Sequence, residues 1–151
     1  MANSGFVITD KGLAVASVAN AGGPLINPVR FKVGYDVNYS LDPEELRQRE
    51  ALNGPVLYQG YLEGYSRVDE DTIMLILPMN YTVGNFAFGE VGIYLEDDTL
   101  FAICVFTDRI EKIRSNDQSQ TGNSYNMRAF LKLAQGAALI QAPTSSLDTA
   151  N

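Results

Sequence analysis

Two apolar runs, residues 87–95 and 100–106, flank an acidic triplet, and this pattern restricts the fold more than any other in the chain. The runs read AFGEVGIYL and LFAICVF, and each is short and rich in β-branched and aromatic residues, as strands are. Aspartate favours turns because its carboxylate bonds the nearby backbone and because it tolerates left-handed conformations. The pattern therefore predicts a β-hairpin whose turn consists of Glu96, Asp97 and Asp98.

Both strands of this hairpin carry apolar residues on both faces. A strand that is buried on both faces needs cover from a helix, a second sheet or another chain. Two covers for the second face stay open on sequence grounds, the N-terminal helix and a second subunit. If a protein interface is the cover, its predicted residues are Phe86, Phe88, Tyr94, Phe101, Ile103 and Val105.

Two helices are predicted ahead of the hairpin. The first begins at Thr9 or Asp10, either of which can cap it, and ends at the Gly-Gly-Pro run 22–24. The second is a short surface helix with Asp42 as its cap and Pro43 at its first position. The first helix is expected to pack closely on a sheet through a narrow apolar stripe of Leu13, Ala14, Val18 and Ala21.

The remaining segments are predicted to be strands and loops. Strict alternation over residues 29–39 predicts a strand with one wet face, broken near its far end at Gly34 and Asp36. Further strands are expected at 56–65, at 73–77 with Pro78 closing it, at 124–133 and at 137–141, with a long loop at 108–123. The predicted fold class is α+β, mainly an antiparallel β-sheet or sandwich with one N-terminal helix and one short surface helix. A single domain is assigned to residues 1–141 and a linker-like tail to 142–151.

Composition excludes several classes of partner. A net charge of -7 argues against nucleic acid and against anionic lipid, since both require a basic surface. No apolar run approaches the roughly 20 residues that span a bilayer, so no membrane insertion is expected. With a single cysteine, the fold must hold by packing, or by packing and oligomerisation.

Residues that could carry out chemistry are scarce. The chain has no histidine, which removes the commonest general base and metal ligand. Cys104 lies inside an apolar run, where burial raises a thiol pKa and makes the side chain inert. The sequence also lacks a phosphate-binding glycine motif. We therefore predict no catalytic residues, no metal site and no cofactor, and we predict that the protein is not an enzyme.

The acidic residues and the tyrosines permit two alternatives. The triplets at 69–71 and 96–98 lack the alternating pattern of a calcium loop, and nothing in the sequence places Glu90 opposite a second acid for glycoside hydrolysis. Tyr58, Tyr61 and Tyr65 could stack on sugars in a carbohydrate-binding module for host-surface recognition, although tyrosines in strands are more often core or cross-strand partners.

Three segments together resemble the N-terminal attachment domain of phage tail-collar fibre proteins, from P2-like and related contractile-tailed phages. The segments are ITDKGLAVASVANAGG, VRFKVGY and FGEVGIYLEDDTLFAIC, and the likeness runs over about residues 6–139. The third segment is the most specific. The matching residues are Ile8, Thr9 and Gly12, then Phe31, Val33 and Gly34, and then Glu90, Val91, Gly92, Ile93, Tyr94, Asp97, Asp98, Leu100 and Ala102.

The resemblance implies a structural virion protein at the baseplate or collar, which fastens a tail fibre to the tail by protein–protein contacts. It implies other tail or baseplate proteins and the fibre as partners, a trimer as the homo-oligomer, and a location in the virion after assembly in the host cytoplasm. The segment YDVNYSLDPEE departs from the glycine- and proline-rich stretch usual in the family. Family members often continue into a shaft and a receptor-binding tip, so we expect either a stand-alone adaptor or the head of a longer fibre.

Overall fold

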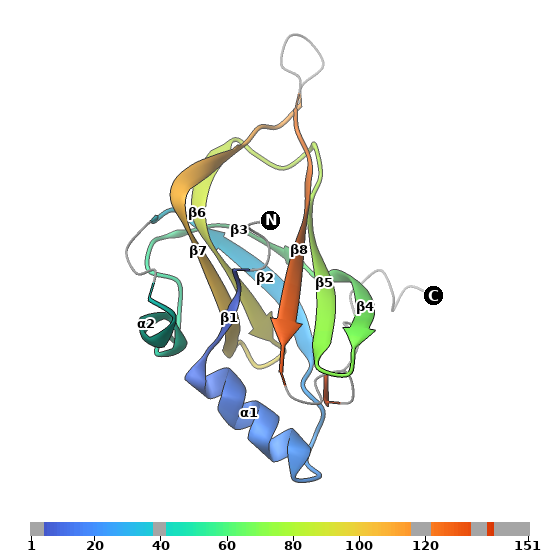
Figure 1. Ribbon diagram of the computed structural model, residues 1–151. Helices are drawn as coiled ribbons and strands as arrows, with labels where there is room; N and C mark the ends of the chain where they lie inside the picture. Colours follow the sequence, from blue (N-terminus) through green and yellow to red (C-terminus); the bar gives the residue numbers. More distant parts are fainter. Residues whose placement is uncertain (1–4, 38–41, 116–121, 134–138, 141–151) are drawn as a thin grey trace.

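Two antiparallel sheets enclose the interior of the protein in the computed structural model, which describes residues 5–37, 42–115, 122–133 and 139–140. The five-stranded sheet has the order β1-β7-β6-β2-β3, and the three-stranded sheet has the order β4-β5-β8 (Figure 1). The elements are β1 (Val7–Ile8), α1 (Asp10–Asn20), β2 (Pro28–Gly34), α2 (Pro43–Arg47), β3 (Val56–Tyr61), β4 (Glu63–Asp69), β5 (Thr72–Met79), β6 (Phe86–Leu95), β7 (Leu100–Lys112) and β8 (Tyr125–Lys132). This architecture confirms the predicted α+β class with its N-terminal helix and its short second helix.

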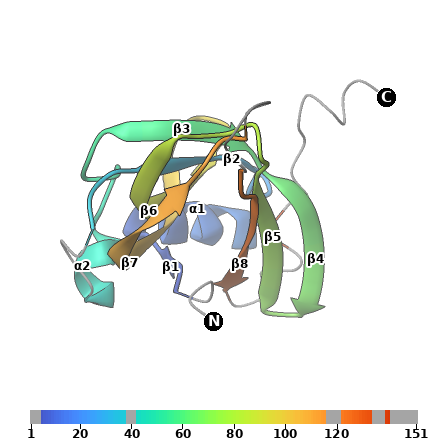
Figure 2. The same ribbon diagram turned by 90° about the horizontal axis from the view of Figure 1, so that it is seen from above.

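The chain passes from one sheet to the other at Leu62. The prediction of a single strand over 56–65 was wrong, because β3 and β4 belong to different sheets. Leu62 is buried, and its N–H donates to the Val29 carbonyl at 3.0 Å, which fixes the bend between the two strands. Figure 2, which looks down on the sheets, shows β3 running into β4 around the interior.

Two other predicted strand limits were wrong. Pro78 does not end its strand, since β5 continues to Met79 and Pro78 pairs with Asn126 of β8. The last pair between β4 and β5 is Glu63 with Ile76, so Pro78 has a paired strand only on its β8 side. This part of β5 therefore resembles an edge strand, in which proline is tolerated. Strand β7 runs on to Lys112, into the predicted loop, because its end pairs with the start of β6.

Some predictions fall mainly outside the described residues. Residues 116–121 of the expected loop and the whole tail 142–151 are among them, so the domain boundary stays a prediction. Of the expected last strand at 137–141, the structure describes Leu139 and Ile140. Ile140 forms a parallel bridge with Ile26, and the Ile26 N–H donates to the Leu139 carbonyl at 2.8 Å.

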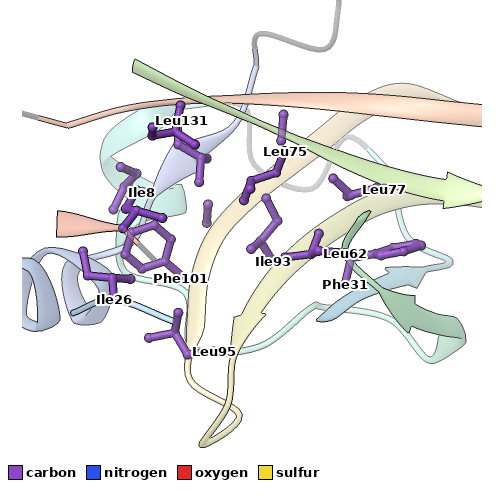
Figure 3. Packing of buried hydrophobic residues seen from close by; sticks show 14 of the residues in the cluster. Ile8, Ile26, Phe31, Leu62, Leu75, Leu77, Ile93, Leu95, Phe101 and Leu131 are labelled. Carbon is purple, nitrogen blue, oxygen red and sulfur yellow. The ribbon is translucent and has the colours of Figure 1, made fainter. Parts of the chain in front are cut away.

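The main core lies between the two sheets. Alternate residues of β5 point into it, and Leu75 and Leu77 have no exposed surface. Figure 3 shows these side chains meeting Ile93 of β6 and Phe31 of β2 from the opposite sheet. The hairpin of β6 and β7 therefore has one face covered by the second sheet, as the two-layer arrangement requires.

The second face of the hairpin is covered by α2 and the chain that follows it. Leu46 of α2 and Leu52 pack there on Tyr94, Leu100 and Ile103, and all five are buried. Of the two covers left open by the sequence, the N-terminal helix does not form this one, which comes from the chain's own Leu46 and Leu52. The short helix that was predicted to be a surface element supplies the cover, because its single leucine faces inward.

Helix α1 buries the face opposite to the one that was predicted to be buried. Thr9 caps it as predicted, but the residues that it buries are the small ones, Gly12, Ala16 and Ala19. The predicted packing stripe of Leu13, Ala14, Val18 and Ala21 lies on the exposed side. The reason is distance: a Cβ atom on Gly12 would lie 2.6 Å from the Phe101 carbonyl oxygen, so only small residues allow this close approach.

The role of α2 as the cover can be tested with Leu46→Ala. We expect this change to lower the free energy of unfolding by about 2–4 kcal/mol, because it leaves a cavity over Tyr94 and Leu100. Val68→Ala is the control: Val68 is exposed on β4, and we expect a change within about 0.5 kcal/mol. Urea unfolding followed by circular dichroism measures both. Equal effects of the two changes would contradict the packing described for α2.

Candidate functional site

The N-terminal motif is fastened to the hairpin by Thr9. Its hydroxyl donates to the Leu100 carbonyl at 2.6 Å and accepts from the Gly12 N–H at 2.9 Å, while its own N–H donates to the Phe101 carbonyl at 3.0 Å. Thr9 is fully buried. A threonine at this position satisfies the first turn of α1 and holds the helix against β7 at the same time. Gly12 allows the contact, since it carries no side chain toward Phe101.

Glu90 is the centre of the second group of contacts. Its carboxylate has no exposed surface, and it accepts hydrogen bonds from the backbone N–H groups of Asn53 at 2.8 Å, Gly54 at 2.7 Å and Asp36 at 3.3 Å. Such charge-assisted bonds are the strong ones, and a buried carboxylate needs them. The group joins β6 to the chain just after β2 and to the segment between α2 and β3.

Two glycines make room for this arrangement. A Cβ atom on Gly34 would lie 2.5 Å from Oε2 of Glu90, so the glycine at the end of β2 admits the carboxylate. A Cβ atom on Gly92 would lie 2.7 Å from Cδ1 of Leu100 and 3.2 Å from Cδ2 of Leu52. Gly92 therefore lets the chain after α2 close over the hairpin. These glycines serve the fold by close approach of their neighbours.

The acidic residues between β6 and β7 form a turn. The Leu95 N–H donates to the Thr99 carbonyl at 2.9 Å, and the Asp98 N–H donates to the Leu95 carbonyl at 2.9 Å. Asp98 has a φ of 73°, in the left-handed region that aspartate tolerates. Hydrogen bonds from the side chain and the backbone of Thr99 lower the pKa of Asp97.

The charge of Asp98 is balanced by the neighbouring strand. Its carboxylate lies 3.3 Å from Nη1 of Arg30 and 3.1 Å from Nζ of Lys32, both on β2. Within the part of the chain that the structure describes, no group of three or more histidine, cysteine, aspartate or glutamate residues is placed to hold a metal ion. The other acidic triplet also makes a turn contact, from the Asp71 N–H to Asp69 Oδ1 at 2.8 Å.

The six residues predicted to form a protein interface are mostly inside the chain. Phe88, Phe101 and Ile103 have no exposed surface, Tyr94 is 4% exposed, and only Phe86 and Val105 are half-buried. Phe88 points into the main core rather than to the outer face because the register shifts between Phe88 and Glu90. The interface on these residues stays a prediction. It would require a partner to reach them past the chain's own cover.

These contacts bring the three segments that resemble tail-collar fibre proteins together around one hairpin. A comparison with protein families confirms the resemblance. The model of a family described as phage tail-collar fibre protein, N-terminal, matches residues 1–148. The chain belongs to the phage tail-collar fibre protein family. No curated protein and no solved structure matches it. The tail-collar fibre domain is accordingly a structural component of a phage tail, and hence of the virion, and its family implies contacts with other tail proteins.

The three tyrosines considered for sugar binding do not form a common exposed surface in the tail-collar fibre domain. Tyr58 packs between Phe31 and Phe86, and burial raises its pKa. Tyr65 is half-buried, and its hydroxyl donates to the Ile140 carbonyl at 3.3 Å. Only Tyr61 of the three is exposed.

Cys104 and Lys112 are both buried, but only the burial of Cys104 was predicted from the sequence. Burial raises the pKa of the Cys104 thiol to about 11, in line with its place in an apolar run. Lys112 was missed by the sequence analysis, which placed it in a loop. Its ammonium donates to the carbonyls of Asn123 at 2.6 Å, Val83 at 2.7 Å and Ile113 at 3.2 Å, and burial lowers its pKa. No local sequence pattern marks this lysine, since its partners are backbone oxygens.

Among the described residues, no helix has the length and the apolar character that crossing a membrane requires.

The role of Glu90 can be tested by substitution. We expect Glu90→Ala to lower the free energy of unfolding by about 3 kcal/mol or more, because three backbone donors lose a charged acceptor. Glu90→Gln keeps one acceptor oxygen and should cost less. Glu63→Ala, at an exposed carboxylate of β4, is the control. Chemical denaturation measures all three, and a loss for Glu90→Ala no larger than that of the control would refute the structural role of Glu90.

Proposed function

We propose that this tail-collar fibre domain joins a tail fibre to the baseplate or collar of a contractile phage tail, through protein–protein contacts and as a trimer. The observation that carries the proposal is the family match, which extends over residues 1–148. The family is one of tail structural proteins, and attachment to the tail is the task of the N-terminal part of a fibre.

The use of the polar groups supports a mechanical role over a catalytic one. The buried polar side chains among the described residues are Thr9, Glu90 and Lys112, and each is bonded to backbone groups of another segment. Side chains whose hydrogen bonds go to the protein's own backbone hold the chain in one conformation and are not available to act on a substrate. A rigid body with buried strands is suited to transmit load between a fibre and a tail.

Phage particles that lack this protein test the proposal. We expect electron micrographs to show assembled tails without attached fibres, and we expect purified wild-type protein to restore attachment when it is added to these particles. Light scattering after size exclusion tests the trimer, with a mass three times that of the chain. Tails that keep their fibres without the protein would refute the attachment role, and a monomer at high concentration would refute the trimer.

A further inference from the structure

Helix α1 presents its larger apolar side chains to solvent. It buries Gly12, Ala16 and Ala19, whereas Leu13 is 41% exposed and Val18 is 56% exposed. Leu25, just after the helix, is 49% exposed. Figure 1 shows α1 at one end of the molecule, with the sheets on one side of it only. A soluble helix ordinarily buries its aliphatic residues, so this inverted arrangement points to a partner.

A groove of about 440 Å³ lies beside this helix face. It is lined by Val15, Leu25, Asn27, Leu95, Glu96 and Asp97. Three of these residues are aliphatic, and they come from the helix, from the chain that leads to β2 and from the end of β6. Val15 of α1 and Leu25, which follows the helix, both line the groove, and Val18 lies one turn after Val15. We call the groove together with the exposed Val18 and Leu25 the α1 face.

The rim of the α1 face offers hydrogen-bond acceptors. Glu96 and Asp97 line the groove, and Oε1 of Glu96 accepts a hydrogen bond from the Asn27 amide at 3.3 Å. Asp98 is neutralised by Arg30 and Lys32, but the ion pairs among the described residues include neither Glu96 nor Asp97. The groove lining contains no lysine or arginine.

We propose that the α1 face docks a segment of another tail protein that carries aliphatic side chains next to a lysine or arginine. The aliphatic side chains cover Val15, Val18 and Leu25, and the cationic group meets Glu96 and Asp97. Charge decides against a second copy as the occupant. Two identical α1 faces would oppose carboxylates to carboxylates in a chain whose net charge is already -7.

The naming of the partner as a tail protein rests on the proposed function, but the chemistry of the surface does not. A library of random peptides about twelve residues long, presented to the purified full chain, is therefore the first probe. We expect the selected peptides to combine leucine, isoleucine, valine or phenylalanine with lysine or arginine. Their synthetic copies should bind more weakly as NaCl rises from about 50 mM to about 500 mM, because the charge contacts are screened.

Variants at exposed positions locate the binding. We expect Val18→Ser with Leu25→Ser, and separately Glu96→Lys, to weaken binding of the selected peptides at least about tenfold in fluorescence anisotropy. The matched controls are Val56→Ser with Tyr61→Ser, which are equally exposed apolar residues elsewhere, and Asp108→Lys, an exposed charge reversal on β7. Circular dichroism verifies that each variant folds. No selected peptides, acidic selected peptides, or equal binding by variants and controls would each overturn the proposal.

Two further measurements separate the alternatives. If analytical ultracentrifugation shows self-association that Val18→Ser with Leu25→Ser abolishes, the α1 face belongs to a second copy and the proposal fails. Fibreless tails are the other probe. If they bind the wild type and the α1-face variants alike, attachment stands and the docking surface fails. If they bind neither while the peptides obey the variants, the docking surface stands and the attachment role fails.

Discussion

The hydrogen bonds of the buried Glu90 carboxylate hold in place the segments that cover the outer face of the β6–β7 hairpin. The carboxylate collects the backbone N–H groups of Asn53, Gly54 and Asp36, which belong to two otherwise irregular segments. Those segments hold α2 and Leu52 over the outer face of β6 and β7. Because one charged acceptor fixes both segments, a single chain can keep the hairpin dry on two sides. The two-sided apolar pattern therefore does not by itself demand a second subunit.

The residues that identify the family have structural work in this fold. Thr9 and Gly12 bring the first helix onto β7, Gly34 admits the Glu90 carboxylate, and Gly92 admits Leu52. These four residues are buried, and they cannot also contact another tail protein. The proposed docking surface lies at the α1 face, which exposes Val18 and Leu25 and, of the matching residues, includes Asp97.

Features with a local physical cause were predictable from the sequence. The turn at Glu96, Asp97 and Asp98 follows from the turn chemistry of aspartate, and the start of α2 follows from its aspartate cap and proline. Helix α1 was also predicted, but the face that it buries was not, because a stripe that contains Leu13 and Val18 is normally the buried one. What decides which face is buried is the close approach of Gly12 to Phe101, a residue 89 positions away.

Features set by distant segments were missed for the same reason. The bend at Leu62 and the continuation of β5 through Pro78 depend on which neighbouring strands are present. Glu90 and Lys112 bond to backbone groups, which leave no mark in the sequence of their partners. The sequence marks Glu90 as a possible catalytic acid and as a family-matching residue, but its role as an acceptor for two loops depends on where those loops lie.

Residue-resolved amide hydrogen exchange tests the central claim about Glu90 most directly. Asn53 and Gly54 lie in a segment without regular structure, where backbone amides ordinarily exchange fast. If the Glu90 carboxylate holds them as described, their amides exchange as slowly as those at the centre of β6 and are released only when the whole domain unfolds. Exchange of both amides at the rate of an exposed loop would contradict the account.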